Sequence, residues 1–380
     1  MKKVYLLLVN VLIVLLSASA QTVENGVYKM SDQFRTKHRE QLIFPKVNGY
    51  EVLKCDFHIH TVFSDGSVWP NIRLQEVWEE GLDVMSITEH MEYSPHKDDV
   101  SLDKNRPYEL IKDDAAQNNI VAIRGSEVTR QTPPGHFNAI FLNDNNKLIR
   151  DNASEKDYDA VRAAHKQGAF IFWNHPGWKP NIEGSYEWID FVDRIHQEGM
   201  LHGIEVMNGA GIHLKALDWC IEHNISVIGT SDVHNLIALT YDMQKPYIHR
   251  TMTLVLSKDR SMKSIREALD AGRTIAWSSK YLAGKEEVLR PFVESCIEVL
   301  PAHHEVERKG NVAKYYEVKN NSSLYLELSL KSGNGSRRIV LPPMSSQVIN
   351  AEAGESQLTY ECDNTFVRSD KKLEITLNLR

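Results

Sequence analysis

The sequence DFHIHTVFSDG at residues 56–66 decides how the rest of the chain is interpreted. Its first half alternates polar and apolar residues, and alternate side chains of an extended strand share one face. Asp56, His58 and His60 therefore point one way, while Phe57 and Ile59 point into the core. Two imidazoles at the end of a strand can bind one divalent cation, but a single His-x-His pair is weak evidence in a chain with 16 His.

Apolar runs of strand length recur after this stretch, at 52–59, 82–88, 120–125, 137–142, 169–173, 203–207 and 225–229. Segments with helical spacing separate many of them, at 72–80, 107–118, 155–167, 212–223 and 261–271. Gly81, Gly168 and Gly272 each follow a helical segment, where a C-terminal capping glycine is expected. Buried strands that alternate with helices predict a parallel sheet, either closed into a barrel or doubly wound.

The ends of the predicted strands favour the barrel. A polar or ionisable side chain lies at or next to an end of each predicted strand. These residues are His58, His60, Glu89, His90, Glu127, His136, Asn174, His175, Glu205, Asn208, Asp232 and His234. A barrel collects the carboxyl ends of its strands at one rim, which is where its active site lies. A doubly wound sheet would concentrate such residues at a single crevice instead. We therefore predict an α/β barrel over residues 52–290.

The N-terminus has the layout of a secretory signal peptide at residues 1–20. Lys2 and Lys3 precede an apolar run at 4–16, and small residues lead to a cleavage site after Ala20. The alternative is a membrane anchor, but the run is shorter than the about 20 apolar residues that span a bilayer. We expect an exported, periplasmic or extracellular protein with no transmembrane segment after cleavage, beginning with an N-terminal arm at 21–51.

Charge and cysteine content exclude some classes of protein. The formal net charge is −7, and about −9 without the first 20 residues, which contain two Lys and no acidic residue, so no nucleic-acid polymer is expected as a partner. The four cysteines are too few for a disulfide scaffold. Export would permit a bridge between Cys296 and Cys362, but spacing alone does not establish it.

Residues 291–380 have a different pattern from the rest of the chain. Polar and apolar residues alternate at 315–318, 323–330, 338–341 and 372–379, with Asn, Gly, Ser and Pro between these runs. Alternation of this kind predicts half-buried antiparallel strands, and hence a small β-sandwich. This part is either a carbohydrate or surface-docking module or a packing appendage. We favour the appendage, because a fold alone carries no function.

Nine residues at the strand ends are candidate metal ligands: His58, His60, Asp65, His90, Glu127, His136, His175, Asp232 and His234. This mixture of imidazoles and carboxylates suits Zn, Mn or Fe better than Ca or Mg. Asp56 is expected to support the ligands rather than to bind metal.

The chain resembles the PHP (polymerase and histidinol phosphatase) family of metal-dependent phosphoesterases. The resemblance spans residues 52–279 and is carried by these motifs: Asp56-x-His58-x-His60-Thr61-x-x-Ser64-Asp65-Gly66, Ile87-Thr88-Glu89-His90, Gly125-Ser126-Glu127, His136, Asn174-His175-Pro176 and Ser231-Asp232-x-His234. It implies a distorted seven-stranded (β/α) barrel that binds two or three divalent transition metals.

The resemblance also implies how the ligands are shared. His58, His60, Glu127 and Asp232 would hold a first metal, and Glu127 would bridge to a second metal held by His136 and His175. Asp65, His90 and His234 would hold a third. Some family members have His in place of Asp65, and an oxygen ligand makes this site harder.

The expected activity is hydrolysis of a small phosphate mono- or diester by a metal-bridging hydroxide. The catalytic residues would be His58, His60, Asp65, Glu127 and Asp232. Arg130 and Lys179 are candidate contacts for the substrate phosphate, and Trp178 could stack on a base or sugar or simply cover the rim. Two alternatives stay open: a metal-dependent hydrolase of an amide or a non-phosphate ester, and a non-catalytic surface or glycan-binding protein.

Overall fold

The computed structural model describes residues 38–148, 159–245, 247–308 and 310–379. The predicted signal peptide at 1–20 and most of the predicted N-terminal arm lie outside these residues. Among the helices that the structure describes, none is long and apolar enough to cross a membrane.

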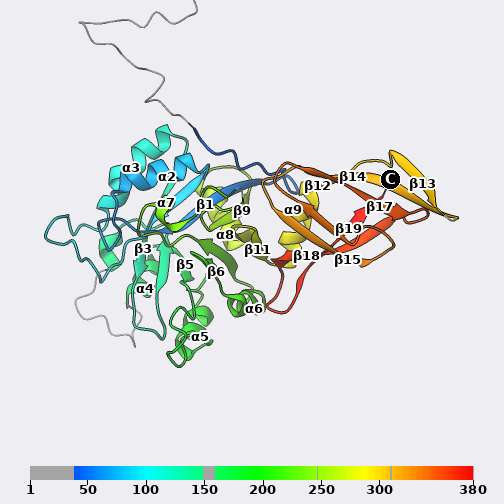
Figure 1. The fold of residues 1–380 in the computed structure, drawn as a ribbon. Helices are drawn as coiled ribbons and strands as arrows, with labels where there is room; N and C mark the ends of the chain where they lie inside the picture. Colours follow the sequence, from blue (N-terminus) through cyan, green and yellow to red (C-terminus); the bar gives the residue numbers. More distant parts are fainter. Residues whose placement is uncertain (1–37, 149–158, 246, 309, 380) are drawn as a thin grey trace, which may run out of the picture. The chain divides into compact units, whose positions relative to one another are not determined.

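The metal-ligand motifs lie on one half of a large mixed sheet (Figure 1). Its strands here are β1 (Glu51–Ile59), β2 (Val84–Ile87), β3 (Val121–Val128), β4 (Phe137–Ile140), β5 (Phe170–Trp173), β6 (Gly203–Asn208), β7 (Gly211–Ile212) and β8 (Ser226–Thr230). Strands β1 to β6 are neighbours in sequence order, and β8 pairs with β6. A parallel bridge between Ile59 and Val233 places the segment after β8 beside the end of β1.

One strand runs against the predicted direction. β4 is antiparallel to both β3 and β5, whereas the apolar runs had predicted parallel strands throughout. The connection from β3 to β4 covers only residues 129–136, and a parallel crossover needs about a dozen residues or more. Because β4 is reversed, His136 at its start lies at the same rim as Glu127 near the end of β3. The α/β class is confirmed, and the predicted count of seven barrel strands stays a prediction.

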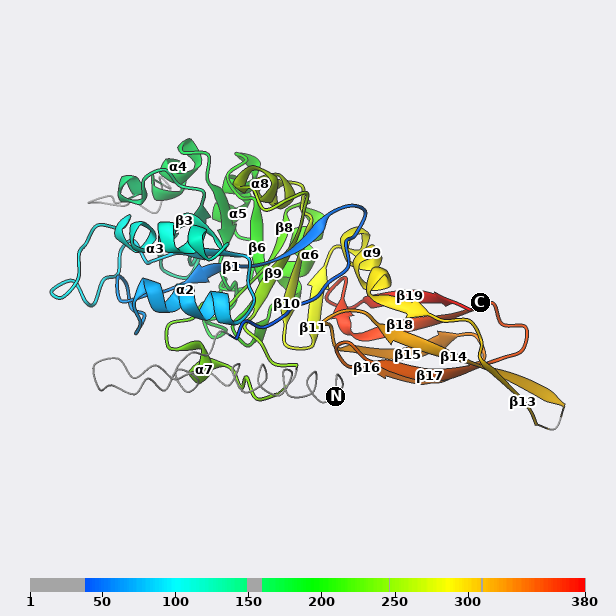
Figure 2. The same cartoon turned by 90° about the horizontal axis from the view of Figure 1, so that it is seen from above.

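Helices pack on the outside of this sheet (Figure 2). They are α2 (Pro70–Glu79), α3 (Arg106–Gln117), α4 (Asp159–Lys166), α5 (Asp190–Gln197), α6 (Leu214–Glu222), α7 (Ile237–Thr240) and α8 (Met262–Asp270), with a 3-10 turn η1 at Asn145–Leu148. Gly81, Gly168 and Gly272 have φ values of +79°, +79° and +65°. These are the left-handed conformations expected of glycines just past a helix.

The interior of the sheet is apolar below the rim. Phe57, Phe170, Phe172 and Ile228 are fully buried in one cluster. His58 on β1 is as completely buried as Phe57 beside it. β1 is therefore covered on both faces, and its polar face needs partners inside the protein.

The sheet continues beyond β1 toward the C-terminal part. β9 (Met252–Ser257), β10 (Thr274–Ser278) and β11 (Tyr281–Gly284) follow in antiparallel pairs. β11 then pairs in parallel with β18, with Leu282 opposite Thr365. One buried apolar cluster includes Trp277 before this junction and Leu326 after it.

The C-terminal strands beyond helix α9 (Glu286–Cys296) form a separate four-stranded sheet and the far end of the large sheet (Figure 2). One contains β12 (Ile297–Val299), β13 (His304–Arg308), β14 (Asn311–Asn320) and β17 (Ser346–Glu352). The other contains β15 (Leu326–Ser332), β16 (Arg338–Leu341), β18 (Gln357–Phe366) and β19 (Lys372–Asn378). The predicted boundary at 290/291 falls inside α9, which contains Pro291. Cys296 and Cys362 are buried free thiols, as are the other two cysteines.

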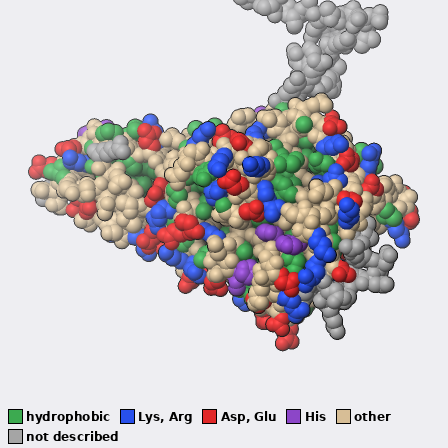
Figure 3. All heavy atoms as spheres, turned by 180° about the vertical axis from the view of Figure 1, so that it is seen from behind, with side chains coloured by type: hydrophobic (Ala, Val, Ile, Leu, Met, Phe, Trp, Pro, Cys, Tyr) green, Lys and Arg blue, Asp and Glu red, His purple; other side chains and the backbone are tan. Residues whose placement is uncertain are grey.

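The surface carries charges of both signs. On the face drawn in Figure 3, Lys and Arg side chains lie among Asp and Glu side chains. This pattern agrees with a chain whose net charge of −7 is small for its 380 residues.

Candidate metal centre

Four ligand atoms from three segments converge at the rim, and we call these residues the first ligand set: His58, His60, Glu127 and Asp232. The Nε2 atoms of His58 and His60 lie 3.0 Å apart. Each lies 3.4 Å from Oε2 of Glu127 and 3.2 Å from Oδ1 of Asp232. A tetrahedral ion with bonds of about 2.0–2.1 Å holds its ligand atoms about 3.3 Å apart. The first ligand set therefore has the spacing of one tetrahedral site.

The chemistry of Glu127 supports a cation at this point. Its Oε2 atom is buried and accepts no hydrogen bond from any described residue, although three imidazole nitrogens lie within 3.4 Å. A buried carboxylate oxygen without a donor is costly. When imidazole nitrogens face such an oxygen with their lone pairs, the atoms repel each other unless a metal ion lies between them. This arrangement is therefore the one expected of atoms that bind the same ion.

Hydrogen bonds on the far side of each imidazole orient the two histidines. Nδ1 of His58 lies 2.7 Å from Oε1 of Glu205. Nδ1 of His60 lies 3.2 Å from Oγ of Ser64, whose hydroxyl donates in turn to Glu89. A proton on Nδ1 in each ring leaves the Nε2 lone pair free toward the first ligand set.

Glu205 is a site residue that sequence analysis placed at a strand end but left out of the ligand set. Besides His58, its carboxylate accepts the backbone N–H of His175 at 2.7 Å, Nδ2 of Asn208 at 2.9 Å and Oγ1 of Thr230 at 2.6 Å. Its only sequence signal was its position near the end of the predicted strand 203–207, whereas in the structure it lies in the middle of β6.

A second ligand set surrounds the other oxygen of Glu127. Oε1 of Glu127 lies 2.9 Å from Nδ1 of His136 and 3.7 Å from Nε2 of His175, and it accepts a hydrogen bond from Asn174 at 2.8 Å. Glu127, His136 and His175 are the residues that the resemblance assigned to a second metal. His90 also lies close enough to Glu127 and His136 to share an ion with them, although its Nδ1 atom is 2.8 Å from Oε2 of Glu127, the oxygen that faces the first ligand set.

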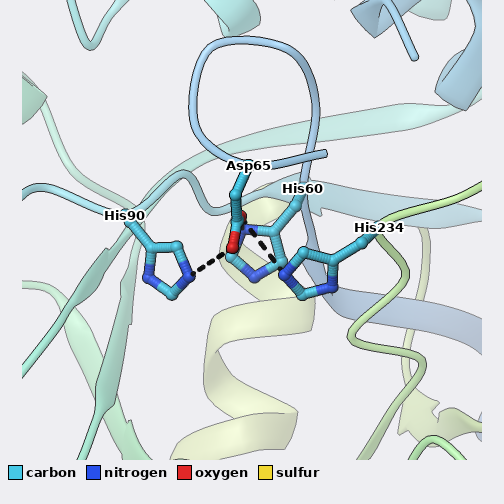
Figure 4. Close-up of side chains that lie close together, drawn as sticks. All are labelled: His60, Asp65, His90 and His234. Carbon is cyan, nitrogen blue, oxygen red and sulfur yellow. Dashed lines mark ion pairs between the residues drawn. The ribbon is translucent and has the colours of Figure 1, made fainter. Parts of the chain in front are cut away.

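The third ligand set consists of Asp65, His90 and His234, and Figure 4 shows the Asp65 carboxylate between these two rings. Oδ1 of Asp65 lies 3.2 Å from Nε2 of His234, and Oδ2 lies 3.6 Å from Nε2 of His90. His60 borders the same set, with its ring stacked 4.2 Å from that of His234. His90 thus has one nitrogen toward the second set and the other toward the third.

The charges of the site favour ionised carboxylates. Burial alone would raise the pKa of Asp65, but His234 and His90 outweigh this effect and hold the pKa well below its usual range. Burial raises the pKa of Glu127 as well, but the neighbouring imidazoles lower it by more, so the pKa lies well below its usual range. Burial lowers the pKa of His60 to about 3, so this imidazole is neutral and able to act as a ligand.

Two ligands have left-handed backbones. His175 has φ of +28° and Asp232 has φ of +51°, a region that residues other than glycine rarely adopt. The N–H of His175 donates to Glu205 at 2.7 Å, and the N–H of Asp232 donates to the carbonyl of His58 at 2.9 Å. Strain of this kind persists where the surroundings fix the backbone, as in functional sites.

Asp56 ties β1 to the loop that carries Asp232, as expected of a supporting residue. Its carboxylate accepts the N–H of Ser231 at 3.2 Å and the hydroxyl of Ser231 at 2.5 Å. The buried guanidinium of Arg250 donates to Asp56 at 3.1 Å and to Glu80 at 2.8 and 2.9 Å.

Arg73 on α2 joins the same two segments through their backbones. Its fully buried guanidinium donates to the carbonyl oxygens of His60 at 2.9 Å, His234 at 2.7 Å and Asn235 at 2.7 Å. It also pairs with Glu76 at 2.8 Å. The loop after β8 is therefore held against the end of β1 by one side chain.

The candidate substrate contacts lie outside the ligand sets. Arg130 forms an ion pair with Glu92, so its charge is already balanced. Lys179 lies with its ammonium 4.3 Å from the centre of the Trp178 ring. Trp178 in turn lies beside two ligand imidazoles, with ring centres 5.7 Å from His136 and 5.4 Å from His175.

Comparison with known proteins covers both parts of the chain. A family model described as an Ig-like domain matches residues 297–378, which agrees with the predicted all-β part. None of the curated proteins matches the chain. Two distant solved structures are each 15% identical: a candidate metal-dependent phosphoesterase from Bifidobacterium adolescentis (TM-score 0.40, 59% of this chain and 98% of that chain) and an amidohydrolase from Chromobacterium violaceum (TM-score 0.36, 48% and 87%). Neither similarity is strong enough to support an argument about this chain.

A much stronger similarity extends over both domains. A two-domain protein from Bacteroides vulgatus, containing a predicted PHP-like metal-dependent phosphoesterase, is 41% identical to this chain. The TM-score is 0.83, and the match covers 91% of this chain and all 100% of the other. This similarity confirms the resemblance that the motifs had predicted. The chain therefore belongs to the family of PHP-like metal-dependent phosphoesterases.

Proposed function

We propose that this protein is an exported hydrolase that cleaves a small phosphate mono- or diester with two or three divalent ions of Zn, Mn or Fe. The observation that carries the proposal is the first ligand set, in which the Nε2 atoms of His58 and His60 lie 3.0 Å apart and each lies within 3.4 Å of the buried Oε2 atom of Glu127 and of Oδ1 of Asp232. His58, His60, Asp65, Glu127 and Asp232 form the catalytic core.

Glu127 organises the reaction centre because its two oxygens face different ligand sets. Oε2 faces His58 and His60, and Oε1 faces His136 and His175. His58, His60 and Asp232 on one side and His136 and His175 on the other could each hold a divalent ion together with Glu127, and such ions would supply an activated water and neutralise charge on phosphoryl oxygens. No serine or cysteine nucleophile is needed, which leaves Ser64 to orient His60.

The side chains around the ligands fix geometry and charge. Glu205 and the Ser64–Glu89 pair keep His58 and His60 in the tautomer that presents Nε2. Lys179 is the cation that we assign to the substrate phosphate, because Glu92 already balances Arg130. Together these groups supply a preorganised site, which is the main source of rate acceleration in phosphate-ester cleavage.

The proposal is tested with purified protein, metal analysis and a panel of phosphate mono- and diesters. We expect two or three equivalents of divalent metal. His58→Ala and Asp232→Ala should each lower hydrolysis by at least about 100-fold and reduce bound metal. His165→Ala and Asp113→Ala, at exposed positions on α4 and α3, serve as matched controls and should retain activity.

Full activity of the His58 and Asp232 variants would overturn the proposal. Hydrolysis of amides or carboxylic esters without hydrolysis of phosphate esters would assign the same ligands to another bond. Export is a separate element of the proposal, tested by finding the native protein outside the cytoplasm with its N-terminus at Gln21.

A further inference from the structure

Trp178 is an exposed aromatic side chain fixed beside the second ligand set. It is 45% exposed, although its ring centre lies only 5.7 Å from that of His136 and 5.4 Å from that of His175. The N–H of Trp178 donates to the carbonyl of His175 at 3.1 Å, so the side chain projects from a turn that begins at a ligand.

This turn is anchored to the protein rather than loose. Gly177 has φ of +82°, and a Cβ atom there would lie 2.6 Å from the Tyr186 ring. The N–H of Gly177 donates to Ser185 at 2.9 Å, and the hydroxyl of Tyr186 accepts the N–H of Lys215 at 2.9 Å. The backbone that carries the indole is thus fixed, while nearly half of the Trp178 surface is exposed to solvent.

A second exposed aromatic side chain lies beyond the imidazole of His90. Tyr93 is 51% exposed, and its ring centre lies 6.1 Å from that of His90. The His90 ring is 5.7 Å from that of His136, which in turn borders Trp178. Exposed aromatic side chains therefore flank the imidazoles at two places, and Lys179 adds a cation 4.3 Å from the indole.

We propose that Trp178 and Lys179, with Tyr93 beside the imidazole of His90, form the subsite for a leaving group that contains a planar ring. The substrate class is then a phosphate ester of a nucleoside or another ring-bearing alcohol. This inference rests on the proposed phosphoesterase function. An exposed tryptophan on a rigid turn stacks on a planar ring at little conformational cost, and the ammonium of Lys179 attracts the anionic phosphate.

The bond changes define what the subsite holds. Hydrolysis breaks the P–O bond to the ring-bearing group, and the oxygen of a water molecule bonds to phosphorus. One water proton passes to the departing oxygen, which leaves as an alcohol. The ring stays in the subsite until that alcohol dissociates, and no other reactant is required.

The test compares two non-hydrolysable probes that differ only in the ring. Benzylphosphonate carries a planar ring and cyclohexylmethylphosphonate a saturated one, and calorimetry on the metal-loaded full chain gives the Kd of each. We expect the wild type to bind benzylphosphonate more tightly. Trp178→Ala should weaken binding of benzylphosphonate roughly five- to tenfold and binding of the saturated probe by much less. Trp178→Phe should keep most of the preference.

Two further variants separate the roles of the residues. Lys179→Met should weaken binding of both phosphonates alike, because both carry the same anionic group. Tyr247→Ala removes an exposed ring that packs on Tyr325 rather than on a ligand imidazole, and it should leave both Kd values unchanged.

The outcomes distinguish the subsite from the proposed function. If the wild type prefers benzylphosphonate and Trp178→Ala abolishes this preference, the subsite is supported. If, in addition, no phosphate ester is hydrolysed, only the phosphoesterase proposal is overturned. Equal binding of the two probes to the wild type, or an equal loss for both in Trp178→Ala, overturns the subsite. Either binding result overturns the subsite even if the enzyme hydrolyses benzyl phosphate, the phosphate ester that corresponds to the first probe.

Discussion

The Nδ1 atom of His58 lies 2.7 Å from Oε1 of Glu205, inside the protein and away from the rim. The other oxygen of the same carboxylate accepts the backbone N–H of His175 at 2.7 Å. One carboxylate outside the three ligand sets thus fixes a residue of the first ligand set and a residue of the second. Partners of this kind commonly tune metal affinity as strongly as some ligands do.

Glu205→Gln should weaken metal binding at both sets. The amide keeps the size of the side chain but removes the negative charge that stabilises the His58 N–H and places a donor where an acceptor is needed. We expect metal affinity about 10- to 100-fold lower, measured by competition with a chelating dye. Glu287→Gln, at an exposed position on α9, should bind metal as the wild type does. Unchanged affinity of Glu205→Gln would show that His58 is oriented by other contacts.

Asp65→Asn should remove one metal equivalent and leave the others. Asp65 supplies the only carboxylate of the third ligand set, and the imidazoles of His234 and His90 hold its pKa well below the usual range. The amide is a weaker ligand without charge, so the third ion loses its electrostatic partner. Elemental analysis after dialysis should give one equivalent fewer than in the wild type. The same stoichiometry in both proteins would mean that Asp65 holds no ion.

The nine candidate ligands could be found from sequence because a strand end is a local pattern. Apolar runs followed by His, Asp or Glu are visible without knowing which strands pair. The reversal of β4 was not visible in the same way, because buried parallel and antiparallel strands have the same apolar run. The length of the connection at residues 129–136 was the one available signal, and it favoured an antiparallel pair.

The supporting residues were harder to find than the ligands. Glu205 in β6 has the sequence signature of a ligand, and only its distance to His58 shows that it supports one. Arg73 lies within α2 and has no signature at all, because its partners are backbone carbonyls that any residue carries. The change of pattern at residue 291 predicted a domain boundary there, yet α9 continues through Pro291 to Cys296. Long-range packing decides these features, and local sequence does not report it.

Arg73 should be needed for stability and for the shape of the rim. Removing its guanidinium leaves the carbonyl oxygens of His60 and Asn235 without a donor, takes one of two donors from that of His234, which keeps the N–H of Ser67, and leaves Glu76 without its ion-pair partner. We expect Arg73→Met to lose about 3 kcal/mol or more of the free energy of unfolding, measured with urea.

Arg73→Lys keeps the charge but lacks the planar fork that reaches several carbonyls. This variant should fold with only a small loss in the free energy of unfolding. Its affinity for metal should nevertheless fall clearly. The finding that contradicts this role is a Lys variant with wild-type metal affinity, since the guanidinium would then only stabilise the fold.

His202 should make the stability of the metal-free protein depend on pH. The N–H of Ile171 donates to Nδ1 of His202 at 3.0 Å, an arrangement that requires an unprotonated Nδ1. Burial lowers the pKa of His202 from 6.5 to about 4 in the folded protein. Between pH 4 and pH 6.5, the imidazole at position 202 is therefore protonated in the unfolded chain but not in the folded chain. The free energy of unfolding should fall as pH decreases from about 6.5 to about 4, by up to about 3 kcal/mol from this group.

His202→Asn isolates this contribution, because the Asn carbonyl can accept the Ile171 N–H but does not titrate. Urea unfolding in the presence of a chelator, at pH 7.5, 6.0 and 5.0, should show a shallower loss of stability for the variant than for the wild type. Other groups titrate equally in both proteins, so the difference between the two profiles belongs to position 202. Parallel profiles would mean that the pKa of His202 is the same in the folded and the unfolded chain, so that this imidazole adds nothing to the pH dependence.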